Sequence, residues 1–232
     1  MQQRALDLEN LLQNPAIHRA DRSAVNKHSG ISTGFRELDH TLPEGGWQAS
    51  GLTEILTDQQ GVGELSLLMP ALARLSEEKR WIAWIAPPHI PYGPALMAHG
   101  VDLSRVLLVH TSPGADTLWA LEQALSAGTC GAVLGWLDNQ AMDHKILRRL
   151  KLAAKAGQSA GFLFRTLRCV ENPSPADLRL VLENMDNGLE VHVLKCRGRS
   201  GVSLMLDVEH ALAEPVFPNA NTGYRRARHY RH

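Results

Sequence analysis

The residues best placed to do chemistry lie in the segment Thr57–Ser66, TDQQGVGELS, which follows the apolar run Leu52–Leu56. An apolar strand, a glycine-containing turn and a helix start are the layout of a phosphate-binding loop. In such a loop, backbone N–H groups surround the phosphates, a lysine neutralises them and a hydroxyl holds magnesium. Here no Lys or Arg occurs from residue 51 to residue 73, and Asp58 and Glu64 stand where a triphosphate needs positive charge.

Like charges at short range in a poorly solvated loop cost about 1–4 kcal/mol, enough to remove ordinary ATP affinity. The sequence therefore predicts a degenerate nucleotide site at Thr57, Gly61, Gly63 and Glu64, with no bound cofactor. Taken alone, the same stretch also fits an ordinary strand–turn–helix in which Gly61 and Gly63 are turn residues.

Residue types that could hold a metal or act as a nucleophile are scattered elsewhere. Cys130, Cys169 and Cys196 are isolated and show no C-x-x-C spacing, so each is expected to be a small buried side chain. His229 and His232 are three residues apart but have no acidic or thiol partner nearby. The sequence predicts neither a metal site nor a catalytic residue, and we do not expect the chain to be an enzyme.

Positive charge gathers in two places, although Lys+Arg and Asp+Glu are equal at 24 each. The last ten residues, GYRRARHYRH, hold four arginines and no acid: Arg225, Arg226, Arg228 and Arg231. Arginines beside tyrosines suit phosphate contact and base stacking, so direct DNA contact is one hypothesis. A solvated end or a docking peptide is the other. Arg197 and Arg199 lie at a strand end, where a hairpin turn around Gly198 and contact with an acidic partner or DNA are both open interpretations.

Strand and helix patterns alternate through the middle of the chain. The expected strands are 51–56, 81–86, 106–110 and 131–136, and the expected helices are 64–78, 95–99, 117–126 and 143–156. This alternation predicts an α/β fold with a mainly parallel central sheet flanked by helices on both faces. Four further strands, at 161–167, 178–182, 189–195 and 202–206, are expected to include an antiparallel edge.

Composition and length indicate one globular domain with extensions at both ends. The chain has 232 residues, 44% of them hydrophobic and 21% charged, which is typical of a folded soluble protein. We expect an N-terminal helix and linker at 1–30, an α/β domain at 31–212 and a basic tail at 213–232. The helix at 4–17 would form an arm that packs on its own core or on a neighbouring subunit. No apolar run approaches a membrane span and the N-terminus lacks a signal-peptide core, so a cytoplasmic location without membrane contact is expected.

The segment Ile31–Ile55 resembles the entry to the core of RecA-family recombinases. The matching features, in order and spacing, are Ser32-Thr33-Gly34, Leu38-Asp39, Leu42, Gly45-Gly46, Gly51 and Glu54-Ile55. Gly100-Val101-Asp102 and the strand after it are also similar, and the likeness covers most of residues 30–210. It implies a RecA-like P-loop-type core with the degenerate turn in the place of the phosphate loop.

Three places where that family carries its chemistry hold other residues in this chain. The loop lysine falls near Gly63 and the magnesium-binding hydroxyl near Glu64. The catalytic glutamate falls on or beside Pro88, and the metal-supporting acid falls near Gly135 and Trp136. Because positioning and charge neutralisation are most of phosphoryl-transfer catalysis, the resemblance implies a non-catalytic RecA-like domain.

Two bacterial families with a degenerate RecA-like domain are similar to this sequence, and both belong to the DNA-damage (SOS) response. Residues 52–165 resemble the division inhibitor SulA, through the strings 80–87, 100–106 and 132–137. The whole chain resembles ImuA more closely, because ImuA adds the entry segment and a further C-terminal region. ImuA is the RecA-like accessory protein of damage-induced translesion DNA synthesis.

The ImuA resemblance implies protein-protein contacts with RecA and with ImuB, a Y-family polymerase homologue, in support of translesion synthesis and induced mutagenesis. Through ImuB it also implies an error-prone replicative polymerase subunit as a partner. The SulA resemblance implies the alternative, inhibition of cell division by binding the tubulin-like protein FtsZ. Arg80, Ile85 and Arg105 fall where SulA has similar residue types, whereas Ala95-Leu96-Met97 stand where SulA carries a tryptophan.

Overall fold

The computed structural model describes residues 30–58, 63–137, 143–185, 187–197 and 200–208. Several sequence predictions concern residues outside these ranges. They are the N-terminal helix at 4–17, Gly61, Arg199, and the tail arginines Arg225, Arg226, Arg228 and Arg231.

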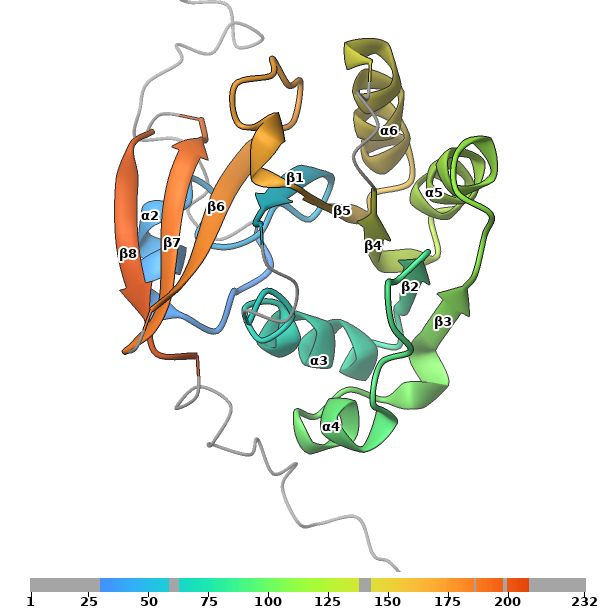
Figure 1. Cartoon of the computed structure of the whole chain (residues 1–232). Helices are drawn as coiled ribbons and strands as arrows, with labels where there is room; N and C mark the ends of the chain where they lie inside the picture. Colours follow the sequence, from blue (N-terminus) through green and yellow to red (C-terminus); the bar gives the residue numbers. More distant parts are fainter. Residues whose placement is uncertain (1–29, 59–62, 138–142, 186, 198–199, 209–232) are drawn as a thin grey trace, which may run out of the picture.

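Eight strands form one mixed sheet (Figure 1). In chain order they are β1 (Gly51–Leu56), β2 (Trp81–Ile85), β3 (Val106–Val109), β4 (Cys130–Trp136), β5 (Ala160–Arg165), β6 (Leu178–Met185), β7 (Gly188–Lys195) and β8 (Val202–Leu206). Their order across the sheet is β3-β2-β4-β5-β1-β6-β7-β8. All pairs from β3 to β6 in this order are parallel. The last two pairs, β6 with β7 and β7 with β8, are antiparallel. The predictions of an α/β class, a mainly parallel sheet and an antiparallel edge are confirmed.

Helices cover both faces of the parallel part of the sheet (Figure 1). The α-helices are α2 (Arg36–Thr41), α3 (Met69–Glu77), α4 (Gly93–Ala98), α5 (Ala115–Ser126) and α6 (His144–Ala156), and two 3-10 turns are η1 (Leu103–Arg105) and η2 (Leu167–Cys169). Buried residues of α2, α3 and α4 pack in one cluster, and those of α5 and α6 pack in another. The predicted two-sided arrangement is therefore present.

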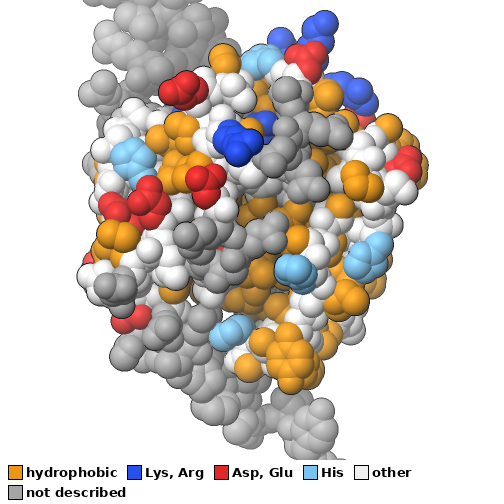
Figure 2. All heavy atoms as spheres, in the orientation of Figure 1, with side chains coloured by type: hydrophobic (Ala, Val, Ile, Leu, Met, Phe, Trp, Pro, Cys, Tyr) orange, Lys and Arg blue, Asp and Glu red, His pale blue; other side chains and the backbone are white. Residues whose placement is uncertain are grey.

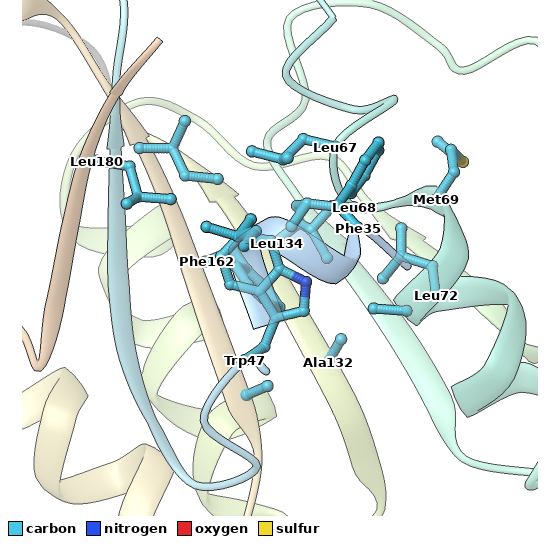
Figure 3. Packing of buried hydrophobic residues seen from close by; sticks show 14 of the residues in the cluster. Phe35, Trp47, Leu67, Leu68, Met69, Leu72, Ala132, Leu134, Phe162 and Leu180 are labelled. Carbon is cyan, nitrogen blue, oxygen red and sulfur yellow. The ribbon is translucent and has the colours of Figure 1, made fainter. Parts of the chain in front are cut away.

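Alternation along β2 shows how the sheet separates these two cores. Ile82 and Trp84 belong to the cluster with α3, whereas Ala83 and Ile85 belong to the cluster with α5 and α6. This is the period of two expected of a strand buried on both faces. Figure 3 shows the centre of the larger cluster, where the Trp47 ring meets the Phe162 ring edge-on at a centroid distance of 5.5 Å.

Three helices begin two or more residues from the predicted start, α5 at Ala115 rather than at 117 among them, and proline explains the other two. The helix expected from Glu64 starts at Met69, and Pro70 occupies its first turn. Proline clashes with the carbonyl four residues earlier, so a regular helix cannot extend far upstream of it. Residues 64–68 form turns instead. Likewise α4 starts at Gly93 rather than at 95, with Pro94 in its first turn.

The entry segment owes its sequence pattern to local hydrogen bonds. The Asp39 carboxylate accepts from the Ser32 hydroxyl at 2.7 Å and from the Thr33 backbone N–H at 2.8 Å. Ile31 and Trp47 exchange two backbone hydrogen bonds, which closes the segment into a loop. Gly46 lies so close to this bridge that a Cβ on it would be 2.2 Å from the Ile31 carbonyl oxygen. The Ser-Thr-Gly, Leu-Asp and Gly-Gly elements therefore have a structural role in this chain.

Candidate functional site

A cavity of about 340 Å³ opens at the carboxyl ends of the parallel strands β1 to β5. Ligand sites in open α/β sheets form at this edge, because the loops that leave the strands meet there. The lining comes from the segments after all five strands: Thr57, Asp58, Glu64, Ala86, Pro87, Pro88, His110, Thr111, Pro113, Gly114, Thr117, Leu118, Trp136, Leu137, Phe164, Arg165 and Thr166. The topology alone brings these distant segments together.

The cavity gathers the three separated places that the sequence singled out. Thr57 and Glu64 come from the turn after β1, Pro88 from the loop after β2, and Trp136 from the end of β4. Gly63 is outside the lining, with a backbone φ of 96° that favours glycine. The sequence predicts that each segment follows a strand. The parallel pairing of the strands is what brings the three segments together in the lining of one cavity.

The electrostatics of the cavity do not favour a polyphosphate. Asp58 and Glu64 contribute two carboxylates to the described wall, and Glu64 is buried. The Arg165 guanidinium is also on the wall, but its Nη1 donates a 2.7 Å hydrogen bond to Glu54. A charge already paired in the interior neutralises a ligand less than an unpaired one would. Two threonines of the lining, Thr111 and Thr117, are joined by a 2.7 Å hydrogen bond between their hydroxyls.

Sequence reasoning missed a buried ionic group beneath this cavity. Glu54 in the centre of β1 accepts from Arg165 on β5 and from Nε of Arg179 on β6, each at 2.7 Å. Arg179 also donates to the backbone carbonyls of Cys169 and Val170. The signal was present: Glu54 and Arg165 are the single charges of β1 and β5, and Arg179 lies between two leucines at the start of β6. Charges are rarely buried unless they are paired, so three such positions on adjacent strands could have indicated the group.

The end of β2 carries a strained backbone beside the cavity. Ala86 has a φ of 52°, although it is not glycine. Its N–H donates to the Val109 carbonyl at 2.9 Å, and the chain continues into Pro87 and Pro88. Left-handed residues other than glycine cost about 1–2 kcal/mol and persist where the surroundings hold them. The strain sets the direction in which the proline loop leaves the sheet.

The aromatic wall of the cavity is packed on itself. Trp136 stacks on Phe164 at a centroid distance of 4.6 Å and lies against Trp84 at 5.4 Å. At least one face of the Trp136 ring is therefore occupied by an aromatic neighbour, which reduces the surface on which a planar ligand could stack.

The residues that matched SulA residue types are unevenly exposed. Ile85 is buried in the core, so it cannot contact a partner directly. Arg80 donates to the carbonyls of Cys130 and Gln158 at 2.9 and 3.3 Å. Arg105 lies over the Trp81 ring, 5.5 Å from its centroid.

An apolar surface lies close to these residues and was not predicted. We call it the α4 patch, and it consists of Ile90, Tyr92, Met97 and Leu103, with exposed fractions of 76%, 73%, 55% and 37%. The Leu103 side chain lies against Gly93 at the start of α4, which places η1 beside α4. The four exposed side chains come from one stretch of the chain, residues 90–103, and several exposed apolar side chains in one region indicate a contact site more strongly than a single one.

Of the predicted basic contact residues, the structure places only Arg197 among the described residues, where it is exposed at the end of β7. The neighbouring Lys195 donates to the Ser174 carbonyl at 2.8 Å. Burial, together with the nearby charges of Lys151 and Arg179, lowers the pKa of the Lys195 ammonium. On α6, Arg149 pairs with Glu122 and Lys151 pairs with Asp177.

The three cysteines, each predicted to be a small buried side chain, differ in exposure, and His229 and His232 lie outside the described residues. Cys130 and Cys169 are buried and Cys196 is half-buried, and burial raises the pKa of the Cys130 thiol. Within the described ranges, no three His, Cys, Asp or Glu residues are grouped so that they could hold a metal ion. No helix in the described part of the chain is long and apolar enough to cross a membrane.

Comparison with known proteins shows a similarity that is confined to the central segment. Residues 51–161 match the family model described as "Cell division inhibitor SulA". SulA of Edwardsiella piscicida is 39% identical over 102 residues, which are 44% of this chain and 60% of that protein. SulA of Yersinia pestis (strain Pestoides F) is 37% identical over 101 residues, 44% of this chain and 59% of that protein.

Among solved structures, the crystal structure of SulA from Pseudomonas aeruginosa is 30% identical, with a TM-score of 0.41, over 49% of this chain and 97% of that chain. The chain spans about three fifths of the length of the curated relatives it matches. The matched range runs from the start of β1 into β5. It therefore leaves out the entry segment and all of β6, β7 and β8.

The fold and cavity define a mixed α/β protein with an eight-stranded sheet and a loop-lined hollow at the strand ends. Its central segment, residues 51–161, is similar to the SulA family model and to the SulA proteins of Edwardsiella and Yersinia. The finer assignment to ImuA has no support among these matches.

Proposed function

We propose that this protein is a non-catalytic, SulA-like inhibitor of cell division that acts by binding FtsZ. The observation that carries the proposal is that an exposed apolar surface, the α4 patch, lies inside the SulA-related segment. A protein that works by contact needs such a surface, and buried aromatic and aliphatic anchors supply most of the free energy of binding at interfaces. This is the function that the sequence analysis held as its alternative.

The absence of nucleotide chemistry is part of the same proposal. Asp58 and Glu64 line the cavity where phosphates would lie, and Arg165 is already paired with Glu54. In this proposal the core keeps a RecA-like arrangement of loops at the strand ends but lacks the groups that hold magnesium and ATP. The protein would then act only through contacts with other proteins.

The test is an FtsZ assay with a matched surface variant. Purified FtsZ is incubated with the protein, and both GTP-dependent assembly and GTP hydrolysis are measured. We expect the wild-type protein to inhibit both, and Tyr92→Ala/Met97→Ala to weaken inhibition at least about tenfold, because truncating central anchors costs about 1–2 kcal/mol each. Leu152→Ala/Met205→Ala removes two exposed apolar side chains far from α4 and serves as the control. Wild-type protein that leaves assembly unchanged at a large molar excess would rule out the proposal.

A second candidate is an ImuA-type accessory role in translesion synthesis, with RecA, ImuB and an error-prone polymerase subunit as partners. One observation favours it: the segments outside the SulA match are built into the fold. β6 pairs with β1 in the centre of the sheet. From the entry segment, Trp47 packs on Phe162.

Parallel pull-downs with FtsZ, RecA and ImuB separate the two candidates. Full-length protein and a version that lacks residues 223–232 are used as baits, so that the tail's part is measured too. Retention of RecA and ImuB without FtsZ would favour the ImuA-type role. Retention of FtsZ alone would exclude it.

A further inference from the structure

A second groove lies on one face of β6, β7 and β8, and its lining residue Leu167 directly follows Thr166 of the first cavity. Its volume is about 390 Å³, and its lining includes Leu167, Val181, Glu183, Glu190, His192 and Ser203. Figure 2 shows acidic side chains around hydrophobic ones on the left-hand face, over β6 to β8. The groove therefore combines an apolar floor with negative charge.

The two carboxylates of the groove face each other across the sheet. Glu183 on β6 and Glu190 on β7 are register partners. Side chains directly opposite in an antiparallel pair have Cβ atoms about 4.5–5.5 Å apart, and like charges in this arrangement are destabilising. Neither carboxylate has a salt-bridge partner among the described residues. The arrangement calls for a cation between them.

The cations on the same pair of strands are engaged elsewhere. Arg179 and Lys195 are register partners at the opposite end of β6 and β7. Arg179 binds Glu54 and two backbone carbonyls, and Lys195 binds the Ser174 carbonyl. A cation that pairs with Glu183 and Glu190 would therefore come from outside β6 and β7.

We propose that the arginine-rich C-terminal segment, residues 223–232, docks in this groove of the same chain. The segment has four arginines and no acid, which complements the paired carboxylates. A guanidinium is planar and can donate to two carboxylates at once, and its methylene stem packs well on an apolar floor. The tyrosines Tyr224 and Tyr230 add apolar area for Val181 and Leu167.

The course of the chain supports docking within one molecule. β8 ends at Leu206, which pairs with Leu189 beside Glu190. The tail thus leaves the sheet at the acidic end of the groove. From Val208 to Arg225 there are 17 residues, which can span up to roughly 55–60 Å when extended. This length reaches the groove easily.

Docking would compete with any anionic partner for the same arginines. An arginine held between Glu183 and Glu190 is not available to a phosphate or an acidic protein surface. The inference does not depend on whether FtsZ or RecA is the partner, and it gives the basic tail a resting position that either partner would have to displace.

The test measures the access of trypsin to the tail of the full-length protein. Cleavage after the tail arginines is followed by mass spectrometry at low ionic strength in wild type, in Glu183→Gln/Glu190→Gln and in the control Glu37→Gln/Glu77→Gln, which neutralises two exposed glutamates on α2 and α3. We expect the groove variant to be cut at least about fivefold faster than wild type, because each exposed ion pair changes an equilibrium by up to a few-fold. The control should match wild type.

The cleavage assay is repeated at high salt and at several protein concentrations, and the thermal stability of the groove variant is measured. Sodium chloride at 0.5 M should raise the wild-type cleavage rate to that of the groove variant, since exposed pairs are screened. The thermal midpoint of the groove variant should be equal to or above that of wild type, because the substitution removes a like-charge pair. Equal cleavage of wild type and groove variant would overturn the proposal. Protection that increases with protein concentration would also overturn it, because it would place the tail in the groove of another copy.

Discussion

Glu54 and Arg165 form a buried ion pair between the central strand β1 and its neighbour β5, with an Oε1–Nη1 distance of 2.7 Å. Arg179 completes the group from β6 on the other side of β1. The three charges therefore join β1, which lies inside the range that matches the SulA model, to β6 at the start of the antiparallel edge, which lies outside it.

Glu54→Gln should destabilise the fold by about 3–5 kcal/mol, because it leaves two arginines buried without their counter-ion. Denaturant unfolding at neutral pH measures the change, with Glu37→Gln on exposed α2 as the control, expected within about 0.5 kcal/mol of wild type. Replacing all three residues with methionine should cost much less than Glu54→Gln alone, since no charge is then left unpaired. A loss below about 1 kcal/mol for Glu54→Gln would contradict this account.

Ala86→Gly should stabilise the protein by about 1 kcal/mol, because glycine adopts the observed left-handed φ without steric cost. The midpoint of urea unfolding should rise, while the m value, the slope of the unfolding free energy against urea concentration, should stay unchanged. Ala83→Gly, three residues earlier in the buried strand β2, should instead destabilise. If Ala86→Gly lowered the midpoint, the strain at the end of β2 would be in doubt.

Gly46→Ala should destabilise by about 1–3 kcal/mol, because the added methyl group would overlap the Ile31 carbonyl oxygen and force the entry loop to shift. Gly93→Ala is the matched control, since a Cβ there meets only the tip of Leu103 at 3.3 Å. Thermal unfolding followed by the fluorescence of tryptophan, including the buried Trp47, reports both variants. Equal midpoints for the two would mean that the Gly-Gly pair is not needed for this loop.

A fluorescent ATP analogue with magnesium should not bind at physiological nucleotide concentration, because Asp58 and Glu64 repel phosphates and Arg165 is occupied. Anisotropy of the analogue measures this, with a RecA-type ATPase as the positive control. Asp58→Asn/Glu64→Gln removes both charges and shows whether repulsion alone prevents binding. Saturable binding to wild type with measurable hydrolysis would refute a non-catalytic core.

Much of the fold could be predicted because its signals are local. The apolar runs and the turn residues between them placed β1, β2, β4, β7 and β8 within a residue or so. Helix starts were less predictable, because Pro70 and Pro94 set them through a backbone clash that the apolar periodicity does not reveal. The short helix α2 was missed for a related reason, since its six residues are too few to show a periodic pattern.

The candidate surfaces depended on pairings that spacing does not contain. The sequence alone determined that a phosphate-loop-like turn lacks lysine and carries two acids, since this is a matter of residue identity at fixed offsets. It also determined that the last ten residues are arginine-rich and free of acid. Only the tertiary structure decided that Thr57, Pro88 and Trp136 share one cavity, that Glu54 meets two arginines, and that Glu183 faces Glu190. The physical reason is that strand order and register bring together residues far apart in the chain, and these depend on the packing of the whole sheet rather than on any one segment.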